Sequence, residues 1–166
     1  MALTGNTFRK FVSNYVAEDF ETATSRPSFA TVVVKGASQV IDPIGLPVIS
    51  DSAGAFVFYK EASNIATVTA STLPNGSPIG IIVGAKEGFG HNTENVTVTA
   101  GGVNMTVMYR DGVVLGDNID FAITQTTGTV DGAPALSAKQ IAFKLQLEKQ
   151  GVVLKSKAAT TTPSYN

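Results

Sequence analysis

Few residues of this chain have the chemistry of a catalytic or ligand-binding group. The single histidine, His91, stands in "GFGHNTEN" with Glu87 and Glu94 nearby. An imidazole between carboxylates could act as a general base or a metal ligand. A lone histidine in a loop of Gly and Asn is more typical of an exposed surface residue. Such a residue could still titrate near pH ~6.5 and modulate an interface.

The other local motifs are weaker. Ser77 lies in the turn-like stretch "NGSPIG" rather than in a G-x-S-x-G elbow, and only His91 or a lysine could serve as its base. The stretch "GFG" at 88–90 supplies two glycines of a dinucleotide fingerprint, but Thr93 stands where the third is needed. The sequence therefore predicts no catalytic residue, no cofactor and no small-molecule substrate.

Three aspartates could be considered as a cation site. Asp111, Asp117 and Asp120 lie close together in sequence, but a calcium site needs oxygens that converge around one loop. Asp111 precedes Gly112 and Asp117 follows Gly116, which is typical of turns. We therefore expect turn aspartates and no bound metal.

The elements around these residues are mostly strand-like. In 95–120, Val96 and Val98 alternate with threonines, "GG" at 101–102 can form a turn, and Val103, Met105, Val107 and Tyr109 share a face. The Asp-Gly at 111–112 favours a type I′ turn. We expect a three-stranded meander over this stretch, followed by another strand from 118.

Further strands are expected in six short segments, 30–36, 41–50, 54–61, 64–71, 79–85 and 152–156. Two prolines in 41–50 suggest that this segment pairs only at an edge or irregularly. The segment 54–61 is apolar on both faces, with Phe56 and Phe58 on one and Tyr59 on the other. It should be covered on both sides, by the core and by a partner.

Two segments have helical features. The spacing of Phe8, Phe11, Tyr15 and Phe20 follows one helical stripe. This stripe could pack on the chain's own sheet or dock on a neighbouring subunit. In 137–150, Ile141, Phe143, Leu145 and Leu147 alternate as in a strand, but the composition and Gly151 favour a helix. We expect an arm in 1–30, a compact β domain in 31–156 and a polar tail in 157–166.

The bulk composition excludes several classes of partner. The 166 residues are 43% hydrophobic and only 15% charged, below the ~25% of a typical domain. A net charge of −1 gives no basic patch for nucleic acid or an anionic membrane. The stretch "MALTGNTFRK" lacks the apolar region of a signal peptide, and no apolar run approaches the ~20 residues of a membrane span. The polar surface is sparse, so partners could cover part of the apolar surface.

Three motifs, taken in order, resemble a known family. They are "GSPIGIIVGA", "VTVTAGGVNMTVMYRDGVVLGDNI" and "AFKLQLEKQGVVL", and the resemblance covers roughly residues 76–155. The chain is similar there to the head decoration, or cement, proteins of tailed bacteriophages, of the lambda type and its relatives. The N-terminal ~60 residues depart from that pattern.

The resemblance implies a mainly β domain, a small barrel or tulip of short antiparallel strands. It implies attachment to the outside of a virion capsid, with synthesis in the host cytoplasm. The partners would be the major capsid protein and further copies of the chain, as a homotrimer or else a dimer. The expected capsid interface comprises Phe8, Arg9, Phe11, Tyr15, Phe20, Val33, Ile44 and Leu46, and the expected self-association surface comprises Phe56, Phe58 and Tyr59.

Other functions fit the same residues. The runner-up is another virion or surface module, such as a head fibre, a tail-tube subunit or an adhesion domain. The lack of tryptophan disfavours glycan stacking. A small-ligand β-barrel would need a dry, closed interior. An enzyme would need an acid–base pair, which the sequence does not offer.

Overall fold

A computed structural model describes residues 27–60, 62–85, 95–121 and 138–155. These residues are mainly β, with a single α-helix near their C-terminal end. The strands are β1 (Ser28–Lys35), β2 (Gln39–Ile41), β3 (Pro47–Ser50), β4 (Phe56–Phe58), β5 (Ile79–Ala85), β6 (Val96–Val98), β7 (Val103–Arg110), β8 (Val113–Leu115) and β9 (Val153–Lys155), and the helix is α1 (Ala138–Lys149).

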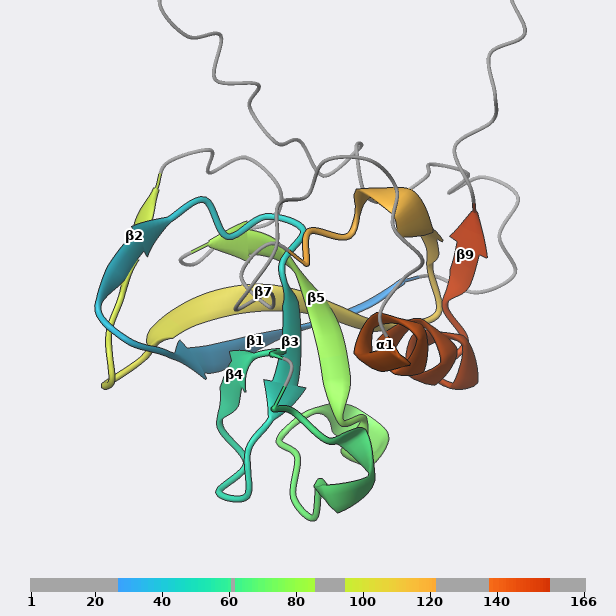
Figure 1. Ribbon diagram of the computed structural model, residues 1–166, viewed down its shortest axis with the longest axis horizontal. Coiled ribbons are helices and arrows are strands. Elements are labelled where there is room, and N and C mark those ends of the chain that lie inside the picture. The colour runs from blue at the N-terminus through green and yellow to red at the C-terminus, as the bar shows by residue number, and fades with distance from the viewer. Residues whose placement is uncertain (1–26, 61, 86–94, 122–137, 156–166) are drawn as a thin grey trace, which may run out of the picture.

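Five of the strands close into a barrel in the order β1-β4-β3-β5-β7, with β7 returning to pair with β1 (Figure 1). The closing pair is antiparallel and long, running from Ser28 opposite Arg110 to Val34 opposite Val103. β1 and β4 are parallel, whereas the other barrel pairs are antiparallel. The sequence expectation of a small, mainly β barrel with one C-terminal helix is confirmed, but the strands are not all antiparallel as expected, because β1–β4 and β8–β9 are parallel pairs.

The barrel has apolar cores on both sides of its wall. One core lies inside and includes Val48, Phe56, Ile82 and Val107. The other lies between the outside of the wall and α1, and includes Ile81, Met108, Phe143 and Leu147. Alternate residues of β5 and β7 point into different cores, so both faces of these strands are apolar, as expected for strands that are covered on both sides.

A two-stranded ribbon continues beyond the barrel. β2 pairs with β6, Gln39 opposite Val98 and Ile41 opposite Val96. The Gly36 amide donates to the Thr99 carbonyl (3.2 Å) and links this pair to the β1–β7 pair. Figure 1 shows β2 rising at one end of the molecule.

The helix α1 ends as its sequence predicts. Gly151 has a φ of +86°, the left-handed conformation that glycine adopts most readily. The Val152 amide donates to the Leu147 carbonyl (3.0 Å), and the Gly151 amide donates to the Glu148 carbonyl (3.0 Å). This is a Schellman motif, with Leu147 and Val152 in the same apolar core. The helical assignment over 137–150 is therefore confirmed.

Three sequence predictions are wrong. The stretch 95–120 is not a meander, because β6 pairs with β2, β7 with β1 and β5, and β8 with β9. The segment 64–71 contains a 3₁₀ turn, Ile65–Thr67, rather than a strand. β3 pairs on both sides inside the barrel, because Pro47 stands at the first position of the strand, where a missing amide is tolerated.

Other expectations fall outside the described residues or only partly within them. The N-terminal helical stripe and the C-terminal tail from 157 lie outside. The strand expected from 118 is a 3₁₀ turn at Gly116–Asn118 and irregular backbone up to Phe121, and the rest of that segment is not among the described residues.

Candidate interaction surfaces

The groups that could do chemistry do not assemble into a reactive site among the described residues. Asp111 lies in the turn after β7 with a φ of +47°, and its carboxylate is 3.3 Å from Arg110 Nε. Asp117 lies in the 3₁₀ turn Gly116–Asn118. Within the described ranges, no group of three or more His, Cys, Asp or Glu residues could hold a metal ion. His91 and the 88–90 motif lie outside these ranges.

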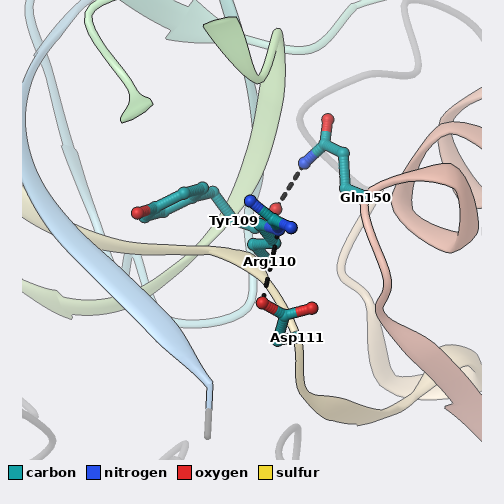
Figure 2. A network of polar contacts seen from close by, with 4 residues as sticks. All are labelled: Tyr109, Arg110, Asp111 and Gln150. Atoms are coloured by element: carbon teal, nitrogen blue, oxygen red, sulfur yellow. Dashed lines mark hydrogen bonds and ion pairs between the residues drawn. The ribbon is translucent and has the colours of Figure 1, made fainter. Parts of the chain in front are cut away.

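The most specific polar contact is structural. Gln150 is buried at the C-terminal end of α1, and its Nε2 donates to the Ile79 carbonyl (3.0 Å) and to the Tyr109 carbonyl. Figure 2 shows the amide reaching Tyr109 beside the Arg110–Asp111 pair. Ile79 begins β5 and Tyr109 lies near the end of β7, so one side chain ties the helix to two neighbouring strands.

Tyr59 fixes the other end of the helix. Its hydroxyl donates to the Lys139 carbonyl (2.7 Å), and its ring lies 4.8 Å from the ring of Phe143, centroid to centroid. Phe121 meets the same Phe143 ring edge-on at 5.7 Å. Burial raises the pKa of the Tyr59 phenol above its ordinary value. The phenol therefore stays neutral and acts as a hydrogen-bond donor.

Two adjoining grooves follow the outer side of α1. The first, of about 500 Å³, is polar and is lined by residues that include Arg110, Asp111, Lys149 and Gly151. The second, of about 460 Å³, is more apolar and is lined by residues that include Ile65, Val68, Ala142 and Leu145. Both grooves are also lined by Gly76, Pro78, Gln146 and Lys149, which makes them one continuous surface.

Sequence reasoning missed the exposed apolar residues of α1. Leu145 is 52% exposed and Ile141 is 46% exposed, whereas Phe143 and Leu147 are fully buried. In a helix, residues two apart differ by about 200° around the axis, so a strand-like alternation places apolar residues on two opposite faces. The alternation that left the segment ambiguous was thus the signal for a helix with one core-facing and one outward apolar face.

Two further apolar side chains are exposed, one on the ribbon and one on β1. Val40 in β2 is 65% exposed, and Val33 in β1 is 41% exposed. Across from Val40, Thr97 also faces solvent, while Val96 and Val98 point into the barrel core. Val33 is the one described member of the expected capsid interface that lies at the surface.

The remaining predicted site residues do not form a surface. Five of them, Ile44, Leu46, Phe56, Phe58 and Tyr59, are buried within this chain. The two-faced strand is covered by the barrel core on the Phe56 side and by the core under α1 on the Tyr59 side, so α1 takes the place of the expected partner. Phe8, Arg9, Phe11, Tyr15 and Phe20 lie outside the described residues.

Comparisons with protein-family models, with curated proteins and with solved structures found no match. Along the described part of the chain, no helix is long and apolar enough to cross a membrane.

Proposed function

We propose that this chain is a structural virion protein that binds the outer surface of a phage capsid and bridges neighbouring major capsid subunits. In this proposal the chain does no chemistry and works on the capsid exterior, alongside further copies of itself, as a trimer or a dimer. The resemblance over residues 76–155 suggests the class of protein. The positions of the exposed apolar side chains supply the physical argument.

The observation that carries the proposal is that apolar side chains are exposed at both ends of the molecule. Figure 1 shows β2 at one end of the long axis, and α1 and β9 at the other. Val40 lies at the first end, and Ile141, Leu145 and Val153 lie at the second. A protein that bridges two subunits needs a contact surface toward each of them.

The scaffold between the two ends suits this role. The barrel is closed, so its strands offer no free edge between the two surfaces. Gln150 and Tyr59 fix α1 against the barrel, so the helix face keeps its orientation relative to the ribbon. Two weak contacts held at a fixed separation strengthen each other through effective concentration.

The experiment is cosedimentation of the purified protein with expanded phage heads that lack a decoration protein, with unexpanded heads as the control. We expect saturable binding to expanded heads alone. Val40→Asp and Leu145→Asp should each lower the affinity about tenfold or more, because each places a charge in an apolar contact. Ser52→Asp, in the exposed turn after β3, adds the same charge elsewhere and should bind as the unaltered chain does.

Deletion of residues 1–25 tests the N-terminal segment separately. If its aromatic stripe contacts the capsid, occupancy on expanded heads falls; unchanged occupancy would remove the segment from the interface. Absence of binding by the unaltered chain to either kind of head would refute the decoration function. The favoured function would then be that of a fibre, a tail tube or another surface module.

A further inference from the structure

The groove along α1 changes character along its length. At the C-terminal end of the helix it is lined by Arg110 and Lys149, with Asp111 as the acidic residue of the lining. Toward the N-terminal end, Leu145, Ile65 and Val68 make it more apolar. Lys139 lies at that far end, where its Nζ donates to the Ser63 carbonyl (2.6 Å). An occupant should therefore carry an acidic part followed by an apolar part.

The described chain begins beside the polar end of this groove. A Cβ placed on Gly112 would lie 3.4 Å from Pro27 Cβ, so Pro27 packs on the turn that follows Asp111. In the β1–β7 pair, Ser28 lies opposite Arg110. Both Arg110 and Asp111 line the groove. The described chain therefore begins at the polar end of the groove.

The sequence before Pro27 has the matching order. The acidic stretch Glu18–Glu21 comes first when the chain is followed backward, and the stripe of Phe8, Phe11 and Tyr15 comes next. Asp19 follows Tyr15 by four residues, so helical spacing places it on the face of that stripe. An acidic residue and then an aromatic stripe would thus meet first the cationic and then the apolar part of the groove.

We propose that residues 7–21 of this chain bind, as a helix, in the groove along α1 of the same molecule. Asp19 pairs with Lys149, and Tyr15 packs on Leu145. The two pairs are consistent with each other, because each helix advances the same ~1.5 Å per residue and both pairs are four residues apart. The five residues 22–26 can span up to ~17 Å, which allows the segment to turn back from Pro27 into the groove.

This arrangement covers the outward face of α1 that is otherwise exposed. Leu145 and Ile141 would be buried under Tyr15 and Phe11. The apolar outward face of α1 would then no longer be exposed to solvent. The inference concerns the free molecule; on the capsid, the segment would have to leave this face so that Leu145 and Ile141 can contact a subunit.

The chain contains no cysteine, so a disulfide between two introduced cysteines reports one contact. We expect the pair Tyr15→Cys with Leu145→Cys to form an intramolecular disulfide under mild oxidation by oxidised glutathione. The matched control is Tyr15→Cys with Val40→Cys, which places a cysteine on the ribbon at a position that is also exposed (65%, against 52% for Leu145). The first pair should form at least about ten times faster, because docking raises the local concentration of one thiol near the other. Circular dichroism and native mass check that each variant is folded and has the same oligomeric state as the unaltered chain.

Charge exchange gives a second reading. Lys149→Glu should slow formation of the Tyr15–Leu145 disulfide severalfold, and adding Asp19→Lys should restore it. Equal rates for the two cysteine pairs would overturn the proposal. A disulfide that joins two chains would also overturn it, since the occupant would then belong to a second copy. The assay contains no capsid, so its failure is distinguishable from failure of the cosedimentation experiment.

Discussion

Replacement of Gln150 by leucine should destabilise the protein well beyond the loss of one side chain. The Gln150 amide supplies hydrogen bonds to two buried carbonyl oxygens, those of Ile79 and Tyr109. Leucine has a similar size but no donor, so both oxygens would lose this partner in a buried site. An unsatisfied buried acceptor costs about 1–3 kcal/mol.

The two acceptors together give an expected loss of about 2–4 kcal/mol in the free energy of unfolding, since a second partner for either oxygen would offset part of the cost. The assay is equilibrium unfolding in urea, with circular dichroism as the signal. For an m-value of about 2 kcal/mol/M, the midpoint should fall by about 1–2 M with the slope unchanged. Gln146→Leu is the matched control on the same helix. Its Nε2 lies 3.4 Å from Gln150 Oε1, a weak contact whose loss should cost about 0.5 kcal/mol or less.

Gln150→Glu sharpens the test through pH. A carboxylate facing two carbonyl oxygens is repelled by them, so the pKa of the introduced glutamate should rise in the folded state. Because the carboxyl then has a higher pKa in the folded state than its unfolded value of ~4.3, the variant keeps its stability below pH ~4.3. It loses stability as pH rises from there toward the folded-state pKa. Gln150→Glu should therefore be less stable than Gln150→Leu at pH 7 and approach or exceed it near pH 4. If Gln150→Leu remains within about 0.5 kcal/mol of the unaltered protein, the reasoning is refuted.

Two further predictions concern the wall of the barrel and the anchor of the helix. Tyr59→Phe should lower the free energy of unfolding by about 1 kcal/mol at pH 8. The difference from the unaltered chain should narrow as pH rises above ~10, because the phenol then ionises readily only in the unfolded state. Urea midpoints that differ by the same amount at pH 8 and 10.5 would contradict this. Gly80→Ala should cost about 3 kcal/mol or more, because its Cβ would lie 2.2 Å from Val107 Cγ1 and 2.9 Å from the Met108 carbonyl oxygen. Gly101→Ala, whose nearest contact would be 3.6 Å away, should change the midpoint of thermal unfolding little.

The parts of the fold that depend on local pattern could be predicted from sequence. The residues Met105, Val107 and Tyr109 share one face of β7 and lie in the barrel core, as their alternation predicts. The C-terminal end of α1 at Gly151 follows from the freedom of glycine at positive φ. Both features are set by residues within a few positions of one another.

Strand pairing could not be predicted in the same way. The Gly101–Gly102 turn does connect β6 to β7, but β6 pairs with β2, more than fifty residues earlier in the chain. The apolar faces of Phe56 and Tyr59 showed that both sides of β4 needed cover, but not that α1, about eighty residues later, would provide it. The exposure of Ile141 and Leu145 on α1 was not predicted for a related reason, since alternation alone does not distinguish a strand from a helix with two apolar faces.

The pairing that closes the barrel has a consequence for how the chain folds. β1 pairs with β7, which lies far along the chain: Ser28 is opposite Arg110, and Val34 is opposite Val103. During synthesis the first strand must therefore remain without this partner until most of the described chain has been made. A barrel closed by such distant contacts pays a large loop-closure entropy before its core forms, so we expect refolding on the millisecond-to-second scale. The helix can add its contribution only afterwards, because its anchors, the carbonyls of Ile79 and Tyr109, are brought together by β5 and β7.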